Sequence, residues 1–380
     1  MSHKAAQQRV PLANWGYEWL THDSYEDLEA CIQALVARGY GGLIIDAYPH
    51  LVAPNEHGEV QEHVYVCVPP HQEFTQAHSQ KVQPRARLLS LLHWAKEYGV
   101  QVWLTSQVLP DSQARRSFIR RPEHFVSVWA EVLRFAQHHG VGDVIKGVDF
   151  CQGFPLNAYG AYRRIFRRNP FNPFARLMPW DAGIRKRIDD YLLGVPRALR
   201  ALFPQYLYGI SAAQGAEPFY HDLSTSELDF YGLALWQDND ISFQLSNTVL
   251  RTGRLPLAKL RNRMVAGWHG LQQDYWAEQW GKRLQHELRF CHQRRLMPLL
   301  VDGYLKVEED AAHWPWVQAF CAERVAVAVQ AGVTHLVVSH YSRPSCLKGW
   351  GDEAWHQEVT TLIREPEQQL SKKEEVEEDD

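Results

Sequence analysis

Short apolar runs alternate with longer segments of helical spacing along most of the chain. The segment 25–38 has apolar residues at i, i+3, i+4 and i+7 spacing, namely Leu28, Cys31, Ile32 and Leu35. A glycine-rich stretch at 39–42 ends this helix, and the apolar run 43–45 predicts a buried strand. The same cycle recurs along the chain, so the pattern predicts βα units around a parallel sheet.

This pattern predicts eight strands in succession. They are expected at 11–20, 43–45, 100–105, 144–150, 206–211, 228–236, 297–302 and 335–339. The expected helices are 25–38, 85–98, 122–139, 184–203, 314–331 and 353–363, with a mainly helical stretch at 241–296, a polar loop at 52–80 and an aromatic, basic insertion at 157–181. Eight βα units predict one (β/α)8 TIM barrel with loop insertions over residues 1–363. A doubly wound sheet is the alternative, but its glycine-rich phosphate turn is missing.

In a TIM barrel the chemistry lies where the strands end, so the residues that close each apolar run are the candidates. These candidate residues are Asp46, His50, Asp149, Gln152, Trp236, Asp302, Tyr304 and His340, with Trp350 in the last connection. They combine carboxylates, amides, imidazoles and aromatic rings, and the whole chain has 14 Trp, 16 Tyr and 15 Phe. Polar groups that bind hydroxyls, together with rings that stack, favour a carbohydrate pocket.

Three of these segments resemble those of a known family. The run IDAYPHL at 45–51, which follows RGY at 38–40, resembles the RGYNxxRIDAFPHL segment of sugar-binding cellulase-like proteins. The runs DFCQGFP at 149–155 and LVDGY at 300–304 resemble two further strand ends of that family, and the resemblance covers about 11–362. The family is related to the cellulases and mannanases of glycoside hydrolase family five, in clan A. The resemblance implies a TIM barrel and two catalytic glutamates about 5–5.5 Å apart, which end the fourth and seventh strands.

The chain departs from this pattern at the catalytic positions. Gln152 and Gly153 replace the expected asparagine and glutamate, and Asp302 replaces the expected nucleophile. Ile44 stands in place of an arginine, and Ala234 lies near an expected histidine. One hypothesis is therefore a divergent glycoside hydrolase with Asp302 as one catalytic carboxylate. The alternative is a pseudoenzyme that binds sugar without turnover, and a third is another reaction on an anionic sugar.

Each candidate also has a purely structural interpretation. In the functional interpretation, Asp302 is a nucleophile, a general base or an acceptor of a hydrogen bond from a sugar hydroxyl. In the structural interpretation, it accepts hydrogen bonds from backbone amides of the next loop. Its partner in catalysis is Asp149 in our assignment, with Asp238 and Glu18 left open, and Asp149 is also readable as a structural strand residue. Asp46 and His50 bind sugar or brace the strand exit. For Trp236 the choices are sugar stacking and core packing.

Composition adds limits on location and partners. The formal charge is −4, and residues 364–380 form a strongly acidic end that predicts a disordered tail. No apolar stretch is long enough to span a membrane, and the polar start lacks a secretion signal. Six scattered cysteines indicate buried thiols of a cytoplasmic protein. No spacing predicts a metal or a cofactor.

The segment 160–187 is rich in arginine and aromatic residues. It suits an anionic sugar, single-stranded nucleic acid or an ordinary solvated helix face. Without its acidic end the chain is nearly neutral, which argues against nucleic acid as a partner. A carbohydrate is thus the expected ligand, and the oligomeric state stays open.

Overall fold

The structure is a computed structural model. It describes residues 9–55, 57–68, 78–106, 110–154, 159–166, 180–212, 217–237, 267, 270–304, 314–338 and 341–365. Within these ranges the side chains of 78, 217–218 and 302–304 are not described.

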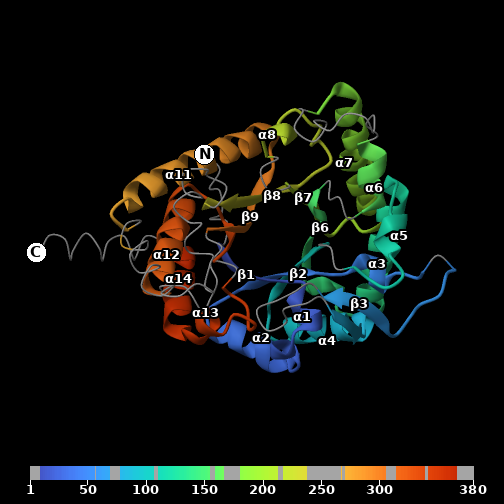
Figure 1. Ribbon diagram of the computed structural model, residues 1–380, viewed down its shortest axis with the longest axis horizontal. Helices are drawn as coiled ribbons and strands as arrows, with labels where there is room; N and C mark the ends of the chain where they lie inside the picture. The colour runs from blue at the N-terminus through green and yellow to red at the C-terminus, as the bar shows by residue number, and fades with distance from the viewer. Residues whose placement is uncertain are drawn as a thin grey trace, which may run out of the picture.

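Eight parallel strands close into a barrel (Figure 1). In chain order they are β1 (Val10–Gly16), β2 (Gly42–Asp46), β5 (Gln101–Thr105), β6 (Ile145–Phe154), β7 (Leu207–Ala212), β8 (Phe230–Trp236), β9 (Met297–Tyr304) and β10 (His335–Val337). Pairing of β1 with β10 closes the ring, with Val10 opposite His335. The predicted TIM barrel is therefore confirmed.

Long helices surround the barrel in the described part of the chain (Figure 1). They are α2 (Leu28–Ala37), α4 (Pro84–Glu97), α5 (Pro122–His138), α7 (Ala182–Leu202), α11 (Gln273–Arg294), α12 (Trp314–Gln330) and α14 (Glu353–Arg364). Their starts carry the expected signals: proline opens α4 and α5, and the Asp27, Asp181 and Asp352 carboxylates cap α2, α7 and α14. None of the described helices is both long and apolar enough to cross a membrane.

The apolar core has two layers. The larger layer lies between sheet and helices, and the smaller one contains Leu12, Ile44, Trp103, Phe230 and Trp236. Glycine makes room for these large rings, because a Cβ atom on Gly147 would lie 2.5 Å from the Trp103 ring. The smaller layer is therefore a packed plug inside the barrel, as expected for this fold.

Four local expectations were incomplete. The expected strand 11–20 ends at Gly16, whose φ is 55°, and α1 (Glu18–Thr21) follows. The expected loop 52–80 contains an antiparallel hairpin, β3 (Val64–Val68) with β4 (His78–Val82). Short helices also occur within the described parts of 157–181 and before α14, namely α6 (Gly160–Ile165) and α13 (Leu347–Gly351). Short segments lack the repeated spacing that reveals a longer element, which explains these misses.

The expectation for the cysteines also needs correction. All six are free, but only four are buried: Cys67 is exposed and Cys346 is half-buried. Cys67 lies on β3, where alternate residues point to solvent. Most of the expected acidic tail, 366–380, lies outside the described residues.

Candidate functional site

The chain makes a tight, buried turn where β2 ends. Asp46 is fully buried, and its Oδ1 accepts a hydrogen bond of 2.8 Å from the backbone N–H of Tyr48. Tyr48 has a left-handed backbone with φ 47°, and its hydroxyl donates to the carbonyl of Tyr17. This conformation is costly for a non-glycine residue, so the surrounding contacts must hold it. The turn leads directly into α3 (Pro49–Val52), which carries His50.

Asp149 lies on β6 between hydroxyl groups of the two neighbouring strands. Its side chain accepts hydrogen bonds from Ser211 on β7, Thr105 on β5 and the backbone N–H of Cys151. Asp149 is only 5% exposed. Burial raises the pKa of this carboxyl to about 7, although the hydrogen bonds oppose the increase. Asp149 is therefore a carboxyl group that exchanges its proton near neutral pH.

The backbone of β6 is irregular at the position that the resemblance assigns to the acid/base glutamate. The pairing of β6 with β7 shifts register on both sides of Gln152. Gly153 then has φ 69°, in the left-handed region that favours glycine. The side-chain oxygen of Gln152 lies 3.5 Å from the Thr105 hydroxyl, which is a weak contact. The backbone N–H of Gln152 donates a 3.1 Å hydrogen bond to the carbonyl of Ser106.

Three predicted residues lie on β8 and β9. Trp236 is buried in the layer inside the barrel, and its carbonyl accepts a 3.0 Å hydrogen bond from Arg283. The backbones of Asp302 and Tyr304 lie opposite Ala234 and Trp236, after a register shift in this strand pair. Asp302 thus lies two residues before the end of β9, in the same barrel as Asp149, and its side chain is outside the described part. The roles assigned to Asp302 and Tyr304 stay predictions.

Of the last two predicted residues, the structure describes Trp350 but not His340. Trp350 stacks on the Arg38 guanidinium, which lies 4.4 Å from its ring centre, and accepts a 2.9 Å hydrogen bond from the same side chain. This contact joins the α13 segment to the end of α2. His340 lies outside the described residues, as does the alternative carboxylate Asp238.

Asn14 is a polar residue that the sequence reasoning missed. It is fully buried on β1, and its side chain donates a 3.0 Å hydrogen bond to the carbonyl of Val301 on β9. Because β10 lies between these strands, the bond joins two strands that are not neighbours. The available signal was alternation along β1, since Leu12 lies in the layer inside the barrel and Asn14 follows two positions later.

The alternative carboxylate Glu18 is engaged in an ion pair. Its Oε1 lies 3.3 Å from Arg343, and Ser345 donates a hydrogen bond to its other oxygen. Arg343 also donates to the backbone carbonyl of Asn14 at 2.7 Å. Glu18 therefore links the ends of β1 and β10.

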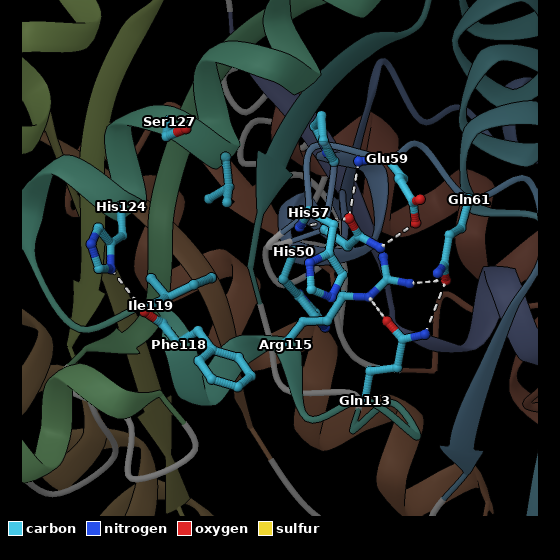
Figure 2. Close-up of a pocket in the computed structure, with 13 residues that line it drawn as sticks. His50, His57, Glu59, Gln61, Gln113, Arg115, Phe118, Ile119, His124 and Ser127 are labelled. Carbon is cyan, nitrogen blue, oxygen red and sulfur yellow. Dashed lines mark hydrogen bonds between the residues drawn. The ribbon is translucent and has the colours of Figure 1, made fainter.

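His50 lines a cavity of about 540 Å³ (Figure 2). The other walls come from the segment 54–61 after β2 and from 113–128, which includes the 3-10 helix η2 (Arg115–Phe118) and the start of α5. We call this space the side cavity. Asp46 and His50, predicted as one sugar-binding pair, lie on either side of the turn at Tyr48, and of the two only His50 lines the side cavity.

Among the described residues, one group offers metal-ligating atoms close together. The possible ligand atoms of His221, His286 and Glu287 lie within 4.8 Å of one another. His221 Nε2 is 3.2 Å from the Glu287 carboxylate, and its ring stacks on Phe290 at 4.4 Å. A hydrogen bond between histidine and glutamate accounts for this arrangement without an ion, and none of the predicted site residues belongs to it.

Part of the basic segment 160–187 is described. Arg185 forms a 2.9 Å ion pair with Asp222, and Arg187 donates a 2.7 Å hydrogen bond to the carbonyl of Ile165. These two arginines therefore have partners within the chain. Residues 167–179 lie outside the described part.

Solved structures with the same fold include several glycoside hydrolases. A putative glycoside hydrolase from Parabacteroides distasonis has 21% sequence identity, a TM-score of 0.77 and coverage of 94% of each chain. An endo-beta-1,4-mannanase from Thermotoga petrophila has 10% identity and a TM-score of 0.53, covering 96% of this chain and 78% of that one. ZgEngAGH5_4, solved in complex with a cellotriose, has 10% identity and a TM-score of 0.52, covering 94% of this chain and 96% of that one. At these identities the likeness shows the fold.

Sequence comparison gives the family. A search of curated proteins found no significant match. The model of the family described as "Sugar-binding cellulase-like" matches residues 12–364, nearly the whole barrel. The predicted resemblance to that family is therefore confirmed. We conclude that this chain belongs to the sugar-binding cellulase-like family, whose barrel is related to those of glycoside hydrolases.

Proposed function

We propose that the protein is a divergent glycoside hydrolase that acts on an oligosaccharide or glycoside, with Asp149 and Asp302 as its catalytic pair. The observation that carries this proposal is the burial of Asp149 on β6 between the hydroxyls of Thr105 and Ser211, which raises the pKa of its carboxyl to about 7. A glycosidase needs one carboxyl group that is still protonated at working pH, and a raised pKa serves that purpose.

The proposed reaction assigns one role to each carboxyl. Protonated Asp149 transfers its proton to the glycosidic oxygen as the bond to the anomeric carbon breaks. Asp302 acts as nucleophile or as the base that activates water, and water supplies the hydroxyl of the released sugar. The names of the similar structures support a carbohydrate substrate, since they include a mannanase and a cellotriose complex.

The test is a screen of aryl glycosides and short oligosaccharides with Asp149→Asn, Asp302→Asn and Asp143→Asn variants. Asp143 is a matched control, because its side chain is 63% exposed and pairs with Lys96 just before β6. We expect the first two variants to lose at least 100-fold in kcat/KM and the control to keep its activity. Wild-type kcat/KM should fall as the pH rises through about 7, where the acid loses its proton. Hydrolysis that survives both Asp149→Asn and Asp302→Asn would exclude the assigned pair.

A second candidate function is sugar binding without turnover. It is favoured by Gly153, which stands in a left-handed conformation at the position assigned to the acid/base, and by the 5% exposure of Asp149. Saturable binding of an oligosaccharide by calorimetry, with no product from any glycoside in the screen, would establish it over hydrolysis.

We also propose one barrel domain over 1–363, a separate acidic segment over 364–380, and a cytoplasmic location. The six free cysteines support that location, because oxidising compartments favour disulfides. Labelling of the native protein with a thiol reagent, directly after cell lysis, should modify exposed Cys67.

A further inference from the structure

The side cavity has two chemically different walls. Phe118 is 46% exposed and, with Ile119 and Val128, forms an apolar wall. Gln61 and Gln113 form an amide wall; Figure 2 shows them on one side of His50 and Phe118 on the other. An accessible aromatic ring near several amides suits a ligand with both apolar and hydroxyl faces.

Arg115 holds the amide wall in place. It is 8% exposed, and its guanidinium donates hydrogen bonds to the side-chain oxygens of Gln113 at 3.1 Å and of Gln61. Both amide oxygens are therefore engaged, and the Gln113 NH2 group also donates to the Gln61 oxygen at 3.4 Å. The Gln61 NH2 group and the second N–H of Gln113 provide the donors for a ligand. The buried Arg115 Nη1 has no hydrogen-bond partner in the described part of the chain. An unmade hydrogen bond at a buried cation is costly, and an oxygen from a ligand would supply it.

The charge around the cavity favours a neutral ligand. The Arg115 guanidinium already lies 3.4 Å from the buried Asp111 carboxylate. Glu59 adds a second carboxylate to the cavity lining. The two acidic side chains offset the single arginine, so an anionic sugar would gain little and would meet Glu59.

We propose that the side cavity is a second carbohydrate site, which binds a neutral sugar ring between Phe118 and the amides of Gln61 and Gln113. Its volume of about 540 Å³ lies within the range of roughly 300–1,000 Å³ that is usual for small-molecule sites. The cavity includes His50, which was predicted to bind sugar, but neither member of the proposed catalytic pair Asp149 and Asp302. It therefore goes beyond hydrolysis, and the loss of either function leaves the other testable.

Calorimetric titration of the full chain with cellotriose tests this proposal. Each variant carries Asp302→Asn as background, so that turnover does not consume the ligand. We expect Phe118→Ala and Gln113→Leu each to weaken one binding event at least tenfold. Tyr275→Ala is the matched control, because Tyr275 is an equally accessible aromatic side chain (50% exposed) on α11. Phe118 is accessible enough that its truncation should leave the fold intact, which thermal unfolding checks.

The outcomes of these measurements separate the possibilities. Binding that is weakened by Phe118→Ala and Gln113→Leu, but not by Tyr275→Ala, supports the site. The proposal would be overturned if neither variant changed the binding of cellotriose or mannobiose. It would also be overturned if galacturonate bound more tightly than either neutral sugar. Aryl-glycoside hydrolysis by the Phe118→Ala variant in the otherwise wild-type chain reports separately on Asp149 and Asp302, and we expect it to be retained.

Discussion

At the scale of single residues, backbone conformation limits what can occupy the mouth of the barrel. Gly153 has φ 69°, and Tyr48, at the end of β2, has φ 47°. A side chain in this region costs about 1–2 kcal/mol unless other contacts offset it. Buried contacts hold Tyr48, through its hydroxyl on Tyr17 and its N–H on Asp46. Gly153 needs no such support, so the position is adapted to glycine.

This argument predicts that glutamate cannot simply be restored on β6. Gly153→Glu should lower the free energy of unfolding by about 1–2 kcal/mol and should not increase hydrolysis. Chemical denaturation and the aryl-glycoside assay measure both effects. Gly351→Glu is the control, since an added Cβ there meets nothing within 4 Å and its φ is not positive. A Gly153→Glu variant with unchanged stability and higher activity would refute the backbone argument.

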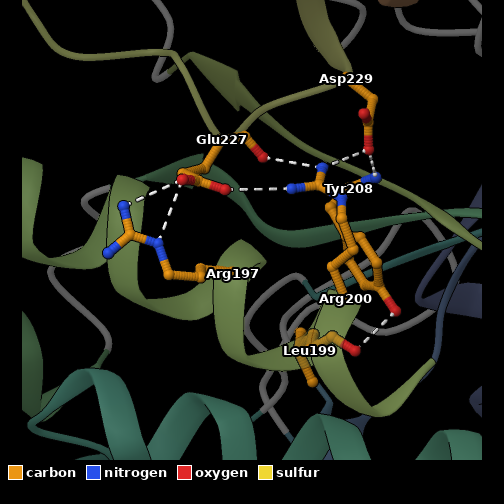
Figure 3. Close-up of polar contacts among 6 residues, drawn as sticks. All are labelled: Arg197, Leu199, Arg200, Tyr208, Glu227 and Asp229. Carbon is orange, nitrogen blue, oxygen red and sulfur yellow. Dashed lines mark hydrogen bonds and ion pairs between the residues drawn. The ribbon is translucent and has the colours of Figure 1, made fainter. Parts of the chain in front are cut away.

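At the scale of elements, polar contacts join the end of α7 to the starts of β7 and β8 (Figure 3). Arg200 donates to the Asp229 carboxylate at 2.7 Å and to the backbone carbonyl of Glu227 at 3.0 Å. The same Asp229 oxygen accepts a 2.8 Å hydrogen bond from the backbone N–H of Tyr208. Arg200 therefore ties a helix to two strands, and the cluster lies at the strand starts, opposite the face where barrel chemistry occurs.

Two arginines of this cluster provide a matched comparison. Arg200→Met should lower the free energy of unfolding by about 1–2 kcal/mol, because it leaves Asp229 and the Glu227 carbonyl without this donor. Arg197→Met should cost less than about 0.5 kcal/mol, because that side chain is 67% exposed and its ion pair with the Glu227 carboxylate lies at the surface (Figure 3). Urea denaturation of both variants measures the difference. Equal losses would show that Arg200 contributes no more than a surface ion pair.

At the scale of the whole molecule, buried titratable groups couple stability to pH in opposite directions. Burial lowers the pKa values of His335 and His356 to about 4, so the stability that depends on these neutral rings is lost as the pH falls from about 6.5 towards 4. Burial raises the pKa of Asp149 to about 7. The folded state therefore keeps a proton that the unfolded state releases, and this contribution to stability is lost as the pH rises from about 4 to 7.

The opposing signs give a prediction for Asp149→Asn. The variant removes the group that destabilises the fold as pH rises, so its stability relative to wild type should increase between pH 4 and pH 7. The difference in the free energy of unfolding between variant and wild type should change by about 4 kcal/mol in all, because the pKa of Asp149 differs by about three units between the folded and unfolded states. Urea denaturation at intervals across this range checks the slope. A difference between variant and wild type that is independent of pH would mean that the pKa of Asp149 is ordinary in the folded state.

Local spacing was enough to predict most long elements and their order. Helix and strand patterns depend on neighbouring residues, as in α2 and β2, and eight βα units in series imply a closed barrel. The positions of Asp46 and Asp149 on the strands of one barrel follow from that order. The hairpin of β3 and β4 was not predicted, because its strands are short and lie within a polar segment.

By itself, the sequence determined the family, the barrel and the list of strand-end residues, because each depends on local pattern or local motif. Only the tertiary structure decided what surrounds those residues. The pKa of Asp149 depends on burial and on hydroxyls of Thr105 and Ser211, which are distant along the chain. The side cavity likewise joins 54–61 to 113–128. Such environments arise when separate segments fold together and exclude water, and no local spacing encodes them.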